Sequence, residues 1–320
     1  MPTTTLFKKL TQIVKSVTTP TEHLSKPQPY HGNTPPNPSS LRLGYTNNLT
    51  GPAFDIPNTT FCGVPYRGKP PARHNLTRHL LLIGPPGSGT SNLQLYLLTQ
   101  QIQRGSGFIF IDTSSDPNTL LNLTHQLKLA SRLTDLLCIN LNTETPNHNI
   151  AHSISSNQCV YISMPTPLNK TTLNFATTLL QNLQTQLGQL GTLPPKQPHP
   201  FILLANDLHT YAPPTIASLF AQARAFNISI IASLQSLDNL TNPPLTYATI
   251  LQNTCTKVVF KPSSPSPELL QLLSTHYNLL QNLDVGTSLV STHTNPPCII
   301  TTPTCPQYSS TTNESFFSEN

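Results

Sequence analysis

A glycine-rich segment at residues 84–92, GPPGSGTSN, has the residue types of a phosphate-binding loop. It follows the apolar run HLLLI and precedes an amphipathic stretch, so a strand, a tight turn and a helix are expected in that order. Glycines in such a turn let successive backbone N–H groups point inward at a helix N-terminus and bind phosphate oxygens. The predicted nucleotide-binding residues are Gly84, Pro85, Pro86, Gly87, Ser88, Gly89, Thr90, Ser91 and Asn92, with the Ser91 hydroxyl as a Mg²⁺ ligand.

One position of this loop departs from the pattern G-x-x-x-x-G-K-[ST], because Thr90 stands where the pattern has lysine. That lysine reaches the β- and γ-phosphates, whereas threonine is shorter and carries no charge. The backbone groups that cradle phosphate do not depend on it. We therefore expect the loop to retain nucleotide binding better than hydrolysis.

A second candidate site follows the apolar run FILLA at residues 201–205, which ends in Asn206 and Asp207. At the same place in a nucleotide-hydrolysing site, one acid holds Mg²⁺ through water and a second polarises the attacking water. Asn206 can accept a hydrogen bond but brings no negative charge to a metal. We predict Asn206 beside the metal and Asp207 in a catalytic role; an ordinary turn at a strand end is the alternative.

Two further polar residues are candidates for catalysis. Gln235 follows the apolar run ISIIASL, where a polar side chain would face the terminal phosphate. Arg224 lies in AQARAF, where an arginine would reach a phosphate held by a neighbouring subunit. A surface arginine is the equal alternative for Arg224.

The elements that must position these residues alternate along the chain. Short apolar runs predict strands at HLLLI, FIFID, LLCIN, CVYIS, FILLA and ISIIASL, with late strands at TKVVF and CIIT. Amphipathic stretches between them predict helices, including a long one at 171–190. Buried strands alternating with helices favour an α/β fold in which helices flank a mainly parallel sheet.

Composition divides the chain into five parts. Residues 1–17 form a short basic helix, 18–40 a polar Pro-rich linker, and 41–75 a small β-rich N-terminal segment. The nucleotide-binding domain covers 76–302, and 303–320 form a disordered tail. Six cysteines without C-x-x-C spacing indicate reduced, mostly buried thiols of a cytosolic protein, and no apolar run is long enough to span a membrane. The net charge of +5 results from few acids and is a weak indication of an anionic partner.

Three segments in this order, 78–120, 201–240 and 253–263, resemble the motor domain of conjugative type IV secretion coupling proteins, which are P-loop ATPases of the FtsK/HerA superfamily. The resemblance covers about residues 76–302. It matches Gln235 and Arg224 to polar residues of the family's motifs. In place of the family's Asp-Pro-Lys-Gly-Asp segment, residues 112–116 read DTSSD, which keeps both acids and loses the lysine; Asn206 replaces the first acid of Asp-Glu.

The resemblance implies a RecA-like P-loop NTPase fold, ATP and Mg²⁺ as cofactors, and a hexameric ring that pumps DNA. Its partners would be DNA, copies of itself, and secretion or relaxosome components. It implies a cytoplasmic location, with a peripheral position at the inner membrane as one option. Since three motif positions lose a charge and one stabilising group is worth roughly 100- to 1000-fold in kcat, the alternative is a non-catalytic nucleotide-binding or assembly subunit.

Overall fold

The computed structural model describes residues 40–46, 49, 53–57, 79–114, 116–141, 149–164, 169–190, 201–213, 215–223, 226–240, 244–264, 266–273, 276–292 and 297–305. The predicted basic helix at 1–17 lies outside these residues, as does the predicted linker except for Ser40. The predicted tail also lies outside them from residue 306 onward.

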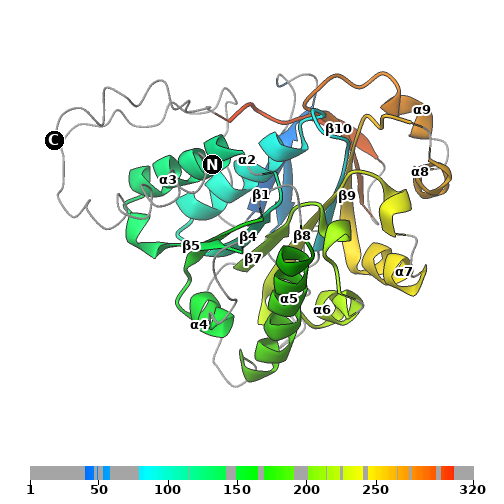
Figure 1. Cartoon of the computed structure of the whole chain (residues 1–320). Coiled ribbons are helices and arrows are strands. Elements are labelled where there is room, and N and C mark those ends of the chain that lie inside the picture. The colour runs from blue at the N-terminus through cyan, green and yellow to red at the C-terminus, as the bar shows by residue number, and fades with distance from the viewer. Residues whose placement is uncertain are drawn as a thin grey trace, which may run out of the picture.

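Within these residues one sheet of eleven strands carries the fold, in the order β2-β1-β11-β10-β9-β3-β8-β7-β4-β6-β5 (Figure 1). Seven neighbouring strands are parallel. In spatial order they are β9 (Thr254–Phe260), β3 (His79–Ile83), β8 (Ile228–Leu234), β7 (Phe201–Ala205), β4 (Phe108–Asp112), β6 (Cys159–Ser163) and β5 (Leu136–Asn140). Their carboxyl ends therefore meet at one edge of the sheet, where ligands of such folds bind.

The other four strands extend the sheet in antiparallel pairs beyond β9. They are β10 (Thr287–Thr292), β11 (Cys298–Thr301), β1 (Ser40–Tyr45) and β2 (Ala53–Pro57). Tyr45 pairs with Thr301, so strands from the two ends of the described chain lie side by side. Strands β1 and β2 thus belong to the same sheet as the nucleotide-binding domain predicted at 76–302.

Helices cover both faces of the sheet (Figure 1). One face carries α2 (Thr90–Gln103) and α3 (Pro117–Leu129), which contact each other. The other face carries α4 (Ile150–Ser155), α5 (Lys170–Leu190), α6 (Ile216–Ala223) and α7 (Pro244–Asn253), with α8 (Pro267–Leu273) and α9 (Tyr277–Leu280) beside them. Short 3₁₀ turns occur at Leu133–Asp135, Leu208–Thr210 and Leu237–Leu240.

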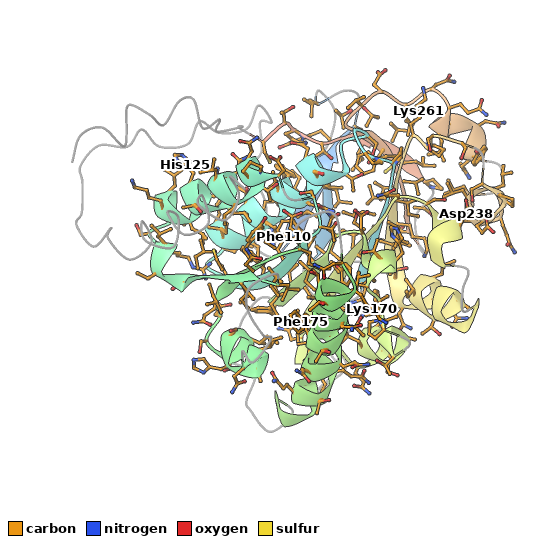
Figure 2. All side chains as sticks on the ribbon, in the orientation of Figure 1. Phe110, His125, Lys170, Phe175, Asp238 and Lys261 are labelled. Atoms are coloured by element: carbon orange, nitrogen blue, oxygen red, sulfur yellow. The ribbon has the colours of Figure 1, made fainter. Side chains whose placement is uncertain are left out.

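Alternate side chains of each strand enter two separate cores, as the pleat of a strand requires. In β4, for example, Phe110 packs with α2 and α3, whereas Ile109 and Ile111 pack on the opposite side. Figure 2 shows Phe110 on the sheet and Phe175 on α5, which packs against the second core. Because both faces are buried, the strands read as continuous apolar runs. The predicted α/β fold with a mainly parallel sheet is confirmed.

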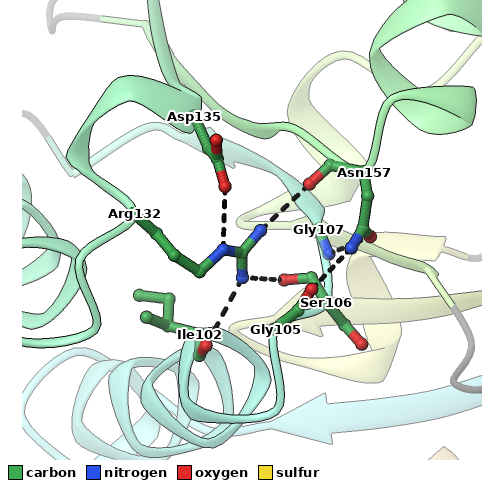
Figure 3. A network of polar contacts seen from close by, with 7 residues as sticks. All are labelled: Ile102, Gly105, Ser106, Gly107, Arg132, Asp135 and Asn157. Atoms are coloured by element: carbon green, nitrogen blue, oxygen red, sulfur yellow. Dashed lines mark hydrogen bonds and ion pairs between the residues drawn. The ribbon is translucent and has the colours of Figure 1, made fainter.

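A polar cluster joins the ends of several elements at the sheet edge opposite the glycine-rich loop (Figure 3). The Arg132 guanidinium donates to the carbonyls of Ile102, Ser106 and Asn157 and pairs with the Asp135 carboxylate at 2.8 Å. The carbonyls of Ile102 and Ser106 belong to the C-terminal end of α2 and the turn after it, and Ile102 O also accepts from Gly105 N at 3.0 Å. Arg132 therefore fixes the far end of the helix that begins at the loop.

Two features differ from the expectations from sequence, namely the oxidation state of Cys255 and one additional strand. Cys255 is disulfide-bonded, so the prediction of reduced thiols is wrong for it. Free thiols are found at Cys138, Cys159, Cys298 and Cys305. Strand β10, which the sequence analysis did not predict, lies between β9 and β11. In the described ranges, no helix has both the length and the apolar character needed to cross a membrane.

Candidate nucleotide-binding site

The glycine-rich loop connects the carboxyl end of β3 to the start of α2, at the sheet edge where the parallel strands end. Gly87 and Gly89 adopt positive φ of 80° and 109°, which glycine tolerates best. Gly89 is the residue that precedes the first turn of α2. Gly84 N donates to Leu234 O at 3.0 Å, which ties the start of the loop to β8, and Ser88 N donates to Pro85 O at 3.2 Å within the loop.

The start of α2 presents unused backbone donors. The first helical hydrogen bond runs from Leu93 N to Gly89 O at 3.1 Å. In the described structure, the preceding N–H groups of Gly89, Thr90, Ser91 and Asn92 donate to no protein acceptor. Such donors, aligned with the positive end of the helix dipole, form an anion-binding site. The geometry therefore fits the phosphates of a nucleotide.

Two hydroxyl groups lie together at the base of the loop. Ser88 Oγ and Thr90 Oγ1 are hydrogen-bonded at 3.0 Å, and both residues are buried. A Cβ added to Gly84 would lie 2.6 Å from Ser88 Oγ and 3.0 Å from Thr90 Oγ1. Thr90 therefore turns toward the base of the loop. As far as the chain is described, no lysine or arginine hydrogen-bonds to the loop.

Of the remaining predicted loop residues, Ser91 is exposed on the first turn of α2, while Asn92 faces another element. The Asn92 amide donates to Pro303 O at 3.0 Å and accepts from Cys305 N at 2.8 Å. Its side chain thus holds the segment after β11, and its backbone N–H is the Asn92 group left to bind a phosphate. Pro85 and Pro86 have no side-chain donors and shape the turn.

The turn before β10 also contacts the loop. Gly286 N donates to Ser88 O at 2.9 Å, and Thr302 N donates to Gly286 O at 3.0 Å. A Cβ added to Gly89 would lie 2.7 Å from the Cα of Gly286. Residues far along the chain therefore hold the loop from its outer side, a contact that no local pattern in the sequence indicates.

Polar residues follow the neighbouring strands at the same edge. Asn206 directly follows β7 and lies beside Asp112 at the end of β4, because Ala205 pairs with Ile111 and Asn206 N donates to Ile111 O at 3.0 Å. Asn206 is buried, with 8% of its surface exposed, and its Oδ1 accepts from Gln94 Nε2 of α2 at 3.1 Å. The structure thus pairs Asn206 with Gln94, and no hydrogen bond joins it to Ser91.

Asp207 follows with a positive φ of 44° and starts a tight turn. Its Oδ2 accepts from Thr113 Oγ1 at 3.0 Å, and Thr113 in turn accepts from Asn206 Nδ2 at 3.2 Å. The carbonyl oxygens of Asn206 and Asp207 accept from the hydroxyls of Tyr211 and Thr210, both at 2.9 Å. Asp207 is therefore a carboxylate at the same sheet edge as the loop. Thr113 and Thr210 hold it, and neither partner was predicted from the sequence.

Asp112 occupies a separate environment. It is buried, and its Oδ1 accepts from Ser114 N and Oγ while its Oδ2 accepts from Tyr161 Oη at 2.8 Å. Burial raises the pKa of Asp112, although the hydrogen bonds from Ser114, Tyr161 and Asn206 oppose that shift. Burial also raises the pKa of Tyr161. Both carboxylate oxygens of Asp112 thus accept hydrogen bonds, and its role is structural.

The two remaining predicted catalytic residues are Gln235 and Arg224. Gln235 is exposed directly after β8, the strand between β3 and β7, so it lies at the same edge as the loop. Arg224 lies outside the described residues. A Mg²⁺ ion bound here would have nucleotide phosphates and the Ser91 hydroxyl as oxygen ligands. In the described ranges, no group of three His, Cys, Asp or Glu side chains suited to a metal occurs.

No protein-family model matches the sequence, and no curated protein matches it either. Solved structures do match. VirB4 of Thermoanaerobacter pseudethanolicus aligns with 85% of this chain and 98% of its own, at 12% identity and a TM-score of 0.55. The bacterial conjugative coupling protein TrwBdeltaN70, in a trigonal form with sulphate, aligns with 73% of this chain and 87% of its own, at 11% identity and a TM-score of 0.50. The chain therefore shares its fold with these two structures, and the predicted α/β P-loop NTPase (RecA-like) fold is confirmed.

Proposed function

We propose that this chain is a P-loop ATPase-like protein of conjugative DNA transfer, which binds ATP with Mg²⁺ at the loop of residues 84–92. The phosphates would lie on the N–H groups at the start of α2, and Ser91 would hold Mg²⁺. Asp207 would orient or deprotonate the attacking water. Gln235 would face the terminal phosphate, and Arg224 would reach the site of a neighbouring subunit.

The observation that carries this proposal is the group of unused N–H donors at the start of α2, at the sheet edge where Asn206 and Asp207 follow β7. Phosphoryl transfer needs positioned donors for the phosphates and an aligned nucleophile more than it needs covalent chemistry from the protein. Both elements lie at one sheet edge, with β8 alone between β3 and β7.

The likeness to the coupling protein and to VirB4 supports DNA as the partner, together with a ring of identical subunits and secretion or relaxosome components. The net charge of +5 is compatible with DNA. The corresponding location would be the cytoplasm, with a peripheral position at the inner membrane as one option. DNA binding through phosphates must weaken as salt rises, so a gel shift between about 50 and 200 mM salt tests this part.

A second candidate function, a nucleotide-binding or assembly subunit without hydrolysis, is favoured by two contacts. Thr90 turns into the loop toward Ser88, so no side chain at that position reaches the terminal phosphate. The Asn206 oxygen accepts from Gln94, so it is engaged before any metal arrives. Both contacts would slow catalysis while leaving the backbone donors in place.

A negative charge placed among the N–H donors at the start of α2 tests nucleotide binding directly. In Ser91→Glu a carboxylate stands at the second position of α2, where it suits the helix dipole but repels phosphate. At about 4 Å and an effective dielectric near 20, two like charges repel by roughly 4 kcal/mol, which predicts at least a 100-fold loss of ATP affinity. Asn118→Glu at the second position of α3 is the matched control, and affinity is measured with a fluorescent ATP analogue.

The same preparations then separate the two functions. Hydrolysis on the order of 1 s⁻¹ or faster, stimulated by DNA, supports the ATPase, since enzyme turnover is usually of that order or above. Binding with no hydrolysis supports the non-catalytic subunit. Failure of the unaltered protein to bind ATP, or equal affinities for Ser91→Glu and Asn118→Glu, would refute nucleotide binding at this loop.

A further inference from the structure

Four side chains form a continuous hydrogen-bonded row across the carboxyl edge of the sheet. Gln94 Nε2 donates to Asn206 Oδ1 at 3.1 Å, Asn206 Nδ2 to Thr113 Oγ1 at 3.2 Å, and Thr113 Oγ1 to Asp207 Oδ2 at 3.0 Å. The row starts on the loop helix α2 and ends on the candidate catalytic carboxylate. We infer that Thr113, oriented by Asn206, positions the carboxylate of Asp207, and that Asn206 acts as a hydrogen-bond donor rather than a weakened metal ligand.

The direction of the row follows from the donor inventory of each group. The NH₂ group of Asn206 has no acceptor lone pair, so the Thr113 oxygen must accept from it. A hydroxyl has one proton, and with its oxygen engaged in this way the proton is left for Asp207. The amide at 206 therefore determines where the Thr113 proton points.

The hydrogen-bonded row is buried, so its direction is set by the side chains and not by water. Thr113 is 4% exposed and Asn206 is 8% exposed, so water cannot readily replace either partner. Thr113 sits directly after β4 and Asn206 directly after β7, and the pairing of these strands fixes their separation. The bonds from Tyr211 and Thr210 to the carbonyls of Asn206 and Asp207 hold the backbone of the turn. Only one Asp207 oxygen is used by Thr113, which leaves the other available for water or metal.

This reasoning changes the meaning of Asn206. A carboxylate at position 206 could not donate to Thr113, so that carboxylate and Asp207 would compete for the single Thr113 proton. Restoring the acid expected there should disturb Asp207 instead of repairing the site. The inference rests on the proposed ATPase function and concerns a positioning role for Thr113 and Asn206.

The test is a double-mutant cycle on hydrolysis with the full chain. Thr113→Val keeps the shape and removes the proton, and a charge-assisted hydrogen bond is worth enough to predict a fall in kcat of about 10-fold or more with KM within about twofold. Thr113→Ser should restore kcat to within about threefold. Asn206→Asp should also lower kcat, and Asn206→Asp with Thr113→Val should be no worse than the poorer single variant.

Thr124→Val is the matched control, because Thr124 Oγ1 donates to the Leu120 carbonyl within α3 and has no contact with the row. Wild-type kcat in Thr113→Val, or a raised kcat in Asn206→Asp, refutes the positioning role. Additive losses in the double variant refute the linkage between the two residues. Nucleotide binding without hydrolysis in the unaltered protein overturns this inference alone, whereas absence of binding overturns the proposed function with it.

Discussion

Replacement of Gly89 by alanine tests how the loop is held. Gly89 has φ of 109°, and a Cβ there would lie 2.7 Å from the Cα and 2.9 Å from the N of Gly286. Both of those atoms are backbone, so the contact cannot be relieved by rotation of a side chain. Either the turn before β10 or the start of α2 must move.

The magnitude follows from two contributions. A left-handed conformation costs an L-residue roughly 1–2 kcal/mol, and crowding of a packed contact costs about 1–3 kcal/mol more. Gly89→Ala should therefore lower the free energy of unfolding by about 2–5 kcal/mol. Gly105→Ala provides the reference, since Gly105 has φ of 73° but an added Cβ there meets nothing within 4 Å; it should cost about 1–2 kcal/mol.

Urea unfolding followed by circular dichroism gives both free energies, and a fluorescent ATP analogue reports on the site. We expect Gly89→Ala to lower ATP affinity at least about 10-fold, because the N–H groups of the first turn are reoriented. Gly105→Ala should leave the affinity unchanged. Equal stability losses in the two variants would refute the close approach of Gly286, and an unchanged ATP affinity would refute the role of the first turn.

Three other outcomes are expected. Burial lowers the pKa of Lys257 to about 8. The pKa of an unfolded lysine is near 10.4, so between pH 8 and pH 10.4 the unfolded chain binds a proton that the folded chain does not. The free energy of unfolding, relative to that of Lys257→Met, should therefore rise over this range. A difference that does not change with pH in urea unfolding contradicts this. Arg132→Lys should cost about 2–3 kcal/mol in the same assay, because an ammonium cannot serve three carbonyls and a carboxylate; a loss under about 0.5 kcal/mol argues against the cluster. Asn92→Ala should speed maleimide labelling of the buried Cys305 thiol at unchanged circular dichroism, and an unchanged labelling rate would show that the Asn92 amide does not hold this segment.

Much of the fold follows from periodicity alone. Strands buried on both faces, such as β3, β7 and β8, are continuous apolar runs, and helices lie between them, so a parallel sheet could be predicted. Strand β10 was missed because TSLVST mixes polar and apolar residues, and its place depends on pairing with β9 and β11. The pairing of β1 with β11 is likewise a contact between distant segments, which local patterns do not encode.

In the candidate site, too, features set by local sequence could be predicted and contacts between distant segments could not. Glycine spacing located the loop, and the polar pair after an apolar run located the turn after β7, because those positions depend on local sequence. The partners of the side chains could not be predicted: Gln94 and Asn206 are 112 positions apart, and Asn92 meets Pro303 across 211. Thr113 is the clearest case. In the sequence Thr113 belongs to a segment that lacks the lysine of the family's motif, whereas in the structure its hydroxyl donates to Asp207.

The contacts of Gly286 and Pro303 with the loop have a consequence for folding. The glycine-rich loop belongs to the first third of the chain, yet the atoms that hold its outer side are synthesised about 200 residues later. Until β10 and β11 join the sheet, Gly89 and Asn92 lack these partners, and contacts of such long sequence separation form slowly. Competence to bind a phosphate at this loop should therefore arise late in folding, when the C-terminal strands have closed the sheet.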